Sequence, residues 1–324
     1  PYTTIDGVSR TVSATWRSIS QFTTSSSDFE TETGTLGLDY AWPISEFQSV
    51  RMGFAAQRSD LFTDPNSSAA EALYWVQNNG NTYTEVQNVG IPPIALTYYG
   101  TRFDTFEYSL GWSYDSRNRA LFADRGSRHR LSASYALPFS DIDFVSFNYD
   151  YLQFIPVSKW FTLMFNSEAG YGHALGDTTS MPPYRRFFAG GPETVRGYRE
   201  SRMGPKDSFG NPYGGNIKFT NQFELLLPMP AKWKNSARFS LFFDIGNVFS
   251  NDDVAYVGRD GVTPVDYEFS FDKLRYSTGV AVQWMAPLGV FRFSYAVPLN
   301  EFKGNAVEYP DETEGFQFSI GQAF

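Results

Sequence analysis

The stretch "ARFSLFFDIGNVF", Ala237–Phe249, alternates between two kinds of position. One set of alternate positions is apolar and consists of Ala237, Phe239, Leu241, Phe243 and Ile245. The intervening set is mostly polar or small and consists of Arg238, Ser240, Phe242, Asp244 and Gly246. Because successive side chains of a β-strand point to opposite faces of a sheet, this period of two predicts a strand with one apolar face and one polar face.

The same alternation recurs along the chain and predicts an all-β fold of about twelve strands. In the last segment, "GFQFSIGQAF", the apolar face consists of Phe316, Phe318, Ile320 and Phe324. Helical periodicity of useful length accompanies none of these segments. The predicted strands cover residues 7–19, 30–42, 47–60, 101–117, 126–137, 141–156, 158–174, 215–228, 236–249, 273–285, 288–298 and 314–324.

The predicted strands and their connections have the proportions of a membrane barrel. Strands of about ten residues or more are long for a soluble sheet but match a tilted strand that crosses a bilayer. Short turns at 43–46, 155–158 and 286–289 alternate with long loops at 61–100, 175–214, 250–272 and 299–313. Short turns at one end and long loops at the other are typical of outer-membrane barrels, and an even strand count returns both chain ends to the short-turn end.

Composition agrees with a transmembrane antiparallel β-barrel. Aromatic residues make up 18% of the 324 residues, yet the mean hydropathy is only -0.34, as expected when apolar and polar positions alternate. No run approaches the roughly 18 apolar residues that a membrane-spanning helix needs. A soluble β-sandwich is the alternative. The barrel is favoured because closure removes the unpaired strand edges that lipid does not tolerate.

Other classes of function find little support in the residues. A net charge of -9 argues against nucleic-acid binding, which needs clustered Lys and Arg. The chain has no cysteine and only two histidines, His129 and His173, so we expect neither a metal site nor a cofactor. Loop 250–272 is acidic but lacks the spacing of an EF-hand. No arrangement of a nucleophile and a base stands out, so we do not expect an enzyme.

One segment, "FFAGGPETVRGYRES" at Phe187–Ser201, does not read as a strand. Arg196 offers a rigid fork of donors suited to carboxylates, Gly197 allows a positive φ or close backbone approach, and Tyr198 supplies packing area and a hydroxyl. On flanking strands, Glu224 and Asp244 occupy the polar register, which faces the lumen of a barrel. The segment therefore has the composition of a structured loop.

Four stretches resemble the surface-antigen barrels of the BamA type, the central insertases of bacterial outer-membrane assembly. They are "FFAGGPETVRGY" (Phe187–Tyr198), "DSRNRALFADRGSRHRLSASY" (Asp115–Tyr135), "FFDIGNVF" (Phe242–Phe249) and "GVAVQWMAPLGVFRFSYAVPL" with "FQFSIGQAF" (279–299 and 316–324). The resemblance implies a sixteen-stranded barrel of which about twelve strands are visible, forming one domain over residues 1–324. Because "PYTTIDGVSR" resembles the end of the family's fourth strand, the first strands and the periplasmic POTRA domains are expected to be absent from this chain.

The resemblance also implies where the functional residues lie. The long loop folds into the lumen, where its motif Val195, Arg196, Gly197 and Tyr198 meets the wall, with Arg196 paired to Glu224 and Asp244. The alternative for Arg196 is a solvated loop residue. The last strand, with Phe316, Phe318, Ile320, Gly321 and Phe324, serves as assembly signal and as one side of a lateral gate; the alternative is a plain lipid-facing strand.

The function implied is that of the central subunit of the outer-membrane assembly machinery, which folds and inserts barrel proteins through a lateral gate by strand augmentation. The implied location is the bacterial outer membrane. The implied partners are outer-membrane lipids and lipopolysaccharide, accessory assembly lipoproteins and unfolded outer-membrane protein clients. Two alternatives remain open: a transport pore of the two-partner secretion type, which shares the loop motif, and a simple diffusion porin.

Overall fold

The computed structural model describes residues 8–20, 29–63, 69–89, 94–230, 232–233, 236–287 and 289–321. Thirteen strands form one antiparallel sheet, and twelve of them follow one another in chain order as a continuous meander. Its first six are β1 (Ser9–Ser20), β2 (Phe29–Pro43), β3 (Gln48–Thr63), β5 (Ile94–Asp115), β6 (Gly126–Ala136) and β7 (Asp143–Pro156). The next six are β8 (Thr162–Leu175), β10 (Ile217–Leu226), β11 (Ala237–Phe249), β12 (Arg275–Ala286), β13 (Gly289–Pro298) and β15 (Phe316–Gly321).

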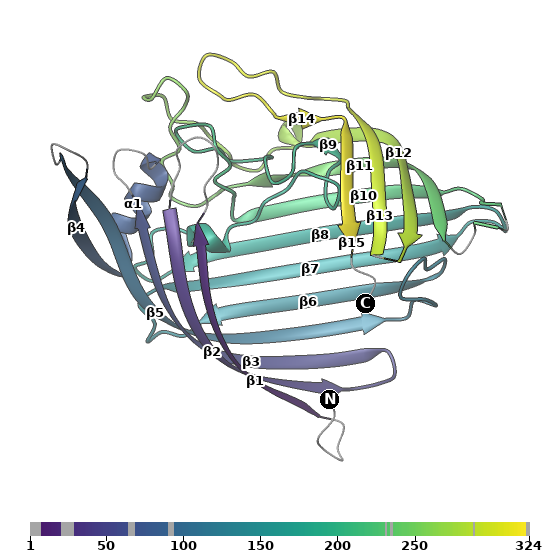
Figure 1. Ribbon diagram of the computed structural model, residues 1–324, viewed down its shortest axis with the longest axis horizontal. Coiled ribbons are helices and arrows are strands. Elements are labelled where there is room, and N and C mark those ends of the chain that lie inside the picture. The colour runs from purple at the N-terminus through teal and green to yellow at the C-terminus, as the bar shows by residue number, and fades with distance from the viewer. Residues whose placement is uncertain are drawn as a thin grey trace.

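These twelve strands are the twelve predicted from the alternation, with shifts at their ends. Figure 1 shows the sheet curving from β1 through β6, β7 and β8 to β13 and β15. Since the strands are antiparallel and even in number, β1 begins and β15 ends at the short-turn end, as predicted. Within the part of the chain that the structure describes, no helix is long and apolar enough to cross a membrane.

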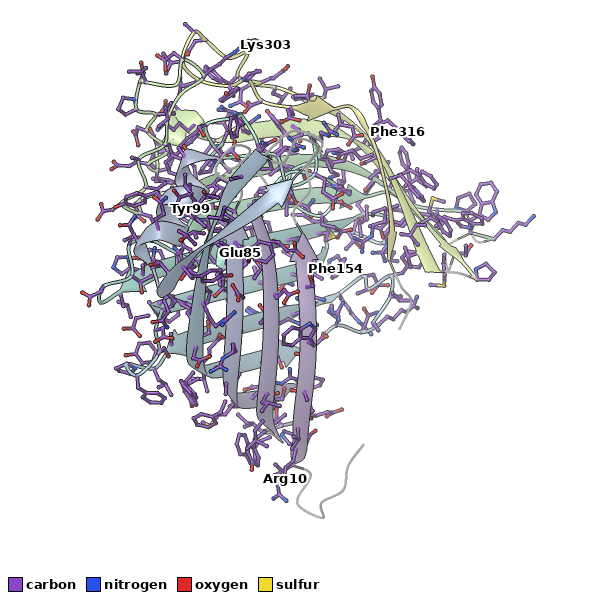
Figure 2. The ribbon with its side chains drawn as sticks, turned by 60° about the vertical axis from the view of Figure 1, so that its left-hand side comes forward. Arg10, Glu85, Tyr99, Phe154, Lys303 and Phe316 are labelled. Atoms are coloured by element: carbon purple, nitrogen blue, oxygen red, sulfur yellow. The ribbon has the colours of Figure 1, made fainter. Side chains whose placement is uncertain are left out.

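The alternation of the sequence becomes an outer face and an inner face of the sheet. In β11, Leu241 and Phe243 are exposed on the outside, whereas Ser240, Phe242 and Asp244 are buried on the inside. Neighbouring β10 repeats this arrangement, with Phe219 and Phe223 outside. Figure 2 shows Phe316 of the last strand projecting away from the sheet in the same way. The exposed apolar face suits lipid, and the polar face lines an interior filled by loops.

The prediction of a plain loop at 61–100 is wrong. This segment contains the helix α1 (Ala70–Asn78) and the strand β4 (Asn81–Val89), and β5 begins at Ile94 rather than at 101. β4 pairs with the first part of β5, which lengthens β5 to 22 residues. Nine helical residues are too few for a helical period to stand out from the sequence.

The long-loop end of the sheet is closed by a hydrophobic cluster, which we call the cap cluster. It joins α1, the inner wall and two long loops through the buried residues Leu61, Ala72, Trp75, Val76, Phe103, Ala136, Ile142, Phe144, Met181, Tyr213 and Tyr256. The indole N–H of Trp75 donates to the carbonyl of Ser180 over 3.1 Å, which ties α1 to the connection between β8 and β10. The long loops are therefore packed structures.

Two further short strands correct the predicted ends of the long loops. β9 (Gly197–Tyr198) lies inside the connection between β8 and β10, and β14 (Thr313–Glu314) lies just before the last strand. The two pair with each other, so the segment at 313–314 belongs to a ladder with the loop and not to the strand predicted at 314–324. The described part of the last strand of the main sheet, β15 (Phe316–Gly321), therefore begins at Phe316.

Candidate functional site: the luminal loop motif and the last strand

Arg196 lies on the inner face of the sheet and is only 4% exposed. Its Nε and Nη2 each donate to a carboxylate oxygen of Asp244 over 2.7 Å, and its backbone N–H donates to Asp244 over 3.0 Å. Its Nη1 donates to Glu224 and completes a second ion pair. The guanidinium carbon also lies 3.6 Å from the centre of the Phe242 ring. The arginine is therefore enclosed, and the alternative of a solvated loop residue does not fit this geometry.

The register of two neighbouring strands explains why these groups meet. Glu224 of β10 lies opposite Phe242 of β11, and Gln222 lies opposite Asp244. Glu224 and Asp244 are thus diagonal neighbours on the same inner face, at a separation that one forked side chain can bridge. The ring of Phe242 lies beside both acids and covers the guanidinium, which favours a cation–π contact. The lumen-facing side chains of these two strands therefore form a binding site for one arginine side chain.

The other motif residues pack the loop tip against neighbouring strands. Val195 and Tyr198 are fully buried, and the Tyr198 hydroxyl lies 3.4 Å from both the carbonyl of Tyr276 and Oδ1 of Asn300. Gly197 adopts a φ of 88°, in the region that favours glycine. A Cβ at this position would lie 3.1 Å from the Cβ of Ala296, so the backbone also approaches β13 closely. The tip needs glycine for conformation and for space.

We expect Gly197→Ala to lower the free energy of unfolding by about 1–3 kcal/mol more than Gly261→Ala does, because of the added overpacking against Ala296. Gly261 is a matched control, since its φ is 74° and nothing lies within 4 Å of an added Cβ. Both variants carry the cost of a left-handed residue, about 1–2 kcal/mol. Urea unfolding in detergent or lipid measures the difference. Equal losses would show that space at Gly197 is unimportant.

A cluster of charges fixes the segment that follows the motif. The backbone N–H of Arg199 donates to the carbonyl of Glu312 over 2.8 Å, continuing the ladder between β9 and β14. The Glu312 carboxylate pairs with Arg199, Arg202 and Lys206 at 3.1–3.3 Å. Burial works against ionisation of Glu312, but Lys206 and Arg202 more than offset it, so the pKa of this carboxyl lies below its ordinary value.

The last strand places its predicted residues on the outside. Phe316, Phe318 and Ile320 are exposed, whereas Gln317 between them is buried on the inside. Gly321 pairs with Val290, and Phe324 lies outside the described residues. Within the described ranges given above, β15 pairs only with β13, through six residue pairs. One edge of β15 is therefore without a strand partner there.

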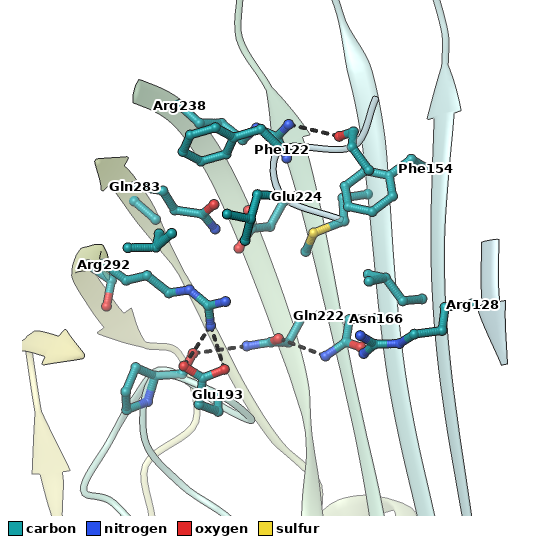
Figure 3. Close-up of a pocket in the computed structure, with 18 of the residues that line it drawn as sticks. Phe122, Arg128, Phe154, Asn166, Glu193, Gln222, Glu224, Arg238, Gln283 and Arg292 are labelled. Carbon is teal, nitrogen blue, oxygen red and sulfur yellow. Dashed lines mark hydrogen bonds and ion pairs between the residues drawn. The ribbon is translucent and has the colours of Figure 1, made fainter. Parts of the chain in front are cut away.

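Next to Arg196 the interior contains a polar cavity of about 340 Å³. Figure 3 shows Arg292 paired with Glu193 and Gln222 hydrogen-bonded to Asn166 at its rim. On the opposite side, Nη2 of Arg238 donates to the carbonyl of Ala123 over 2.8 Å. No group of three or more metal-ligating side chains occurs in the described part of the chain. The lining offers a mixture of hydrogen-bond donors and acceptors.

Sequence reasoning missed two residues that hold the motif and its loop. The alternation puts Phe242 on the inner face but does not indicate its contact with Arg196. The side chain of Arg186, in the run "YRRFF", is fully buried and pairs with Asp252 in the connection after β11. The only available signal was a pair of arginines beside aromatic residues in an otherwise weakly charged stretch.

Comparisons with known proteins agree with the fold. A family model of the Omp85 superfamily domain matches residues 1–324. The chain is 33% identical to the outer membrane protein assembly factor BamA of Neisseria meningitidis over 342 aligned residues, which cover all of this chain and 40% of that protein. It is 24% identical to the sorting assembly machinery 50 kDa subunit of Saccharomyces cerevisiae over 161 residues, which cover 48% of this chain and 31% of that one.

Among solved structures, the crystal structure of BamA from Haemophilus ducreyi lacking POTRA domains 1–3 matches with a TM-score of 0.80 and 24% identity. The match covers all of this chain and 60% of that one. The chain thus spans less than two thirds of the length of either relative named BamA. With its full length matched, the chain belongs to the Omp85 superfamily, and its sheet is part of a barrel of the bacterial outer membrane.

Proposed function

We propose that this chain is the barrel part of an insertase that folds other β-barrel proteins and inserts them into the outer membrane. The names of its relatives support a role in assembly, since one is an outer membrane protein assembly factor and another a sorting assembly machinery subunit. The observation that carries the proposal is the match of the whole chain to the Omp85 superfamily domain, together with a last strand whose outward face is formed by Phe316, Phe318 and Ile320. No chemical step is needed.

In this proposal the edge of β15 that faces away from β13 templates a client strand by β-augmentation. Backbone N–H and C=O groups at an edge supply the hydrogen bonds that a client needs in lipid.

The site residues have separate roles in this proposal. Arg196, Glu224 and Asp244 keep the loop motif inside the lumen, while Phe316, Phe318 and Ile320 keep the gate strand against the membrane. We include lipids and lipopolysaccharide as partners of the outer apolar face. Unfolded barrel clients and accessory assembly lipoproteins complete the set of proposed partners.

We expect a photo-cross-linker at Phe318 to capture a stalled client barrel, and one at Phe243 to capture little or none. The two positions are matched, since both are outward aromatic residues of similar exposure, 46% and 39%. Phe318 lies on the edge strand, whereas Phe243 lies on β11 between two neighbours. Equal capture at both positions would contradict templating by β15.

Depletion of the full-length parent protein tests the broader claim. The proposal expects unrelated barrel proteins to disappear from the outer membrane, and re-expression to restore them. Unchanged barrel levels would refute the insertase. Accumulation of one secreted partner in the periplasm, with barrels unchanged, would instead indicate a two-partner secretion pore.

A further inference from the structure

The last strand touches the luminal motif through one buried side chain. Gln317 is 3% exposed and lies on the inner face of β15. The backbone N–H of Gly197 donates to its Oε1 over 3.2 Å, and its Nε2 donates to the carbonyl of Tyr198 over 2.7 Å. A single carboxamide thus satisfies one backbone donor and one backbone acceptor of the motif, as a neighbouring strand would.

The contact extends an existing ladder. Two residue pairs, Thr313 with Tyr198 and Glu314 with Gly197, already join β14 to β9. After β14 the chain turns into β15, where Gln317 binds the same two motif residues again. A buried amide that loses such partners leaves polar groups unsatisfied, so the arrangement is favourable only when both hydrogen bonds form together.

A continuous set of contacts therefore connects the barrel wall to the gate strand. Asp244 of β11 holds Arg196, the next residue is Gly197, and Gly197 with Tyr198 holds Gln317 of β15. Each of these groups is buried, so water does not compete for the bonds. The position of the loop motif and the position of β15 are linked through this side chain, in addition to the ladder between β9 and β14.

We propose that Gln317 is a positioning residue that couples the luminal loop to the edge strand, so that movement of the loop releases the long-loop end of β15. The proposal rests on the insertase function for its biological meaning, but its structural content stands without it. β15 has three other supports: its ladder to β13, the ladder of β14 with β9 just before it, and the contact of the Ser319 hydroxyl with Glu193 at 3.3 Å. The Ser319 contact is exposed, so water competes for it.

The coupling is tested by hydrogen exchange on the full-length protein in lipid nanodiscs, with no client present. We expect Gln317→Leu to speed exchange about tenfold in peptides that cover 195–200 and 316–321, because two buried hydrogen bonds are lost. Peptides from β11 keep their protection, since the pairing of Arg196 with Asp244 is intact. Ser319→Ala, on the same strand and face, is the matched control and leaves both peptides unchanged.

A double variant separates coupling from a general loss of stability. Arg196→Lys keeps the charge but loses the fork, and the proposal expects faster exchange at 316–321 although Arg196 does not touch β15. Adding Gln317→Leu to Arg196→Lys then produces no further increase there, because the route is already broken. Additive increases, or an unchanged 316–321 peptide in Gln317→Leu, would overturn the coupling.

The outcome is independent of the insertase test. If depletion of the parent protein left other barrels untouched, the exchange results would still decide whether Gln317 links loop and strand. If Gln317→Leu changed exchange as expected but left cross-linking of a client at Phe318 unchanged, Gln317 would still couple loop and strand, and this coupling would have no part in client capture.

Discussion

Arg196→Ala is expected to lower the free energy of unfolding by about 3–5 kcal/mol, the largest loss for any single residue of the loop motif. Removing one partner of a buried ion pair leaves the other charge uncompensated, and here two carboxylates, Glu224 and Asp244, would be stranded on the inner wall. Arg199→Ala is the control from the same loop. Its side chain is 58% exposed and pairs with Glu312, so we expect a loss below about 1 kcal/mol.

Charge reversal shows which of the two carboxylates contributes more to holding Arg196 on the inner wall. Asp244 accepts three hydrogen bonds from Arg196, whereas Glu224 forms one contact and its Oε2 has no partner among the described residues. Arg196→Glu should therefore be rescued better by Asp244→Arg than by Glu224→Arg. Unfolding in urea and recovery of the folded form after heating both report the rescue. If neither reversal restores any stability, direct pairing is not what holds the loop.

The strand order of this fold could be predicted because each strand has its own alternation of apolar and polar residues in the sequence. In β11 the alternation of Leu241 and Phe243 with Ser240 and Asp244 gives the strand, its two faces and its place in a membrane sheet. The helix α1 has no comparable pattern in the sequence. Its residues Trp75 and Val76 are buried because they pack within the cap cluster. A nine-residue helix depends on such packing more than on its own pattern.

The candidate site was harder to predict from the sequence, because it depends on pairs of residues far apart in the chain. The register showed that Glu224 and Asp244 face the lumen, but their pairing with Arg196 was expected only from the family resemblance. Alternation with Phe316 and Phe318 puts Gln317 on the opposite, polar face of the last strand, yet nothing local indicates that its partners are Gly197 and Tyr198. Long-range contacts of this kind follow from how a loop folds back, which alternation does not encode.

The same limitation applies to Arg186, which anchors the loop at its other end. Its Nη1 donates to the Tyr256 hydroxyl over 2.8 Å, and its Nε donates to the carbonyl of Met181 over 3.2 Å. The guanidinium pairs with Asp252 at 3.4 Å and lies 4.5 Å from the centre of the Tyr213 ring. A loop held at Arg186 in the cap and at Arg196 on the wall has two anchors that are separable by mutation.

Arg186→Leu is expected to lower the free energy of unfolding by about 3–5 kcal/mol, because Asp252 would be left as a buried charge. The expected signature differs from that of Arg196→Ala. Limited proteolysis of the purified protein should cut more readily in the connection after β11, where Asp252 lies, whereas hydrogen exchange at 316–321 should stay as in the wild type. That difference arises because Arg186 holds the cap and makes no contact with the motif residues that bind β15.

The double variant Arg186→Leu/Asp252→Asn checks the cause. Asp252 also accepts hydrogen bonds from the backbone N–H of Met181 and from Nδ2 of Asn216, and one amide oxygen can still accept from a donor there. Removing both charges should therefore cost less stability than the sum of the two single losses, since the double variant leaves no isolated charge. Fully additive losses would show that Arg186 acts through packing against Tyr213 and Tyr256 and not through its ion pair.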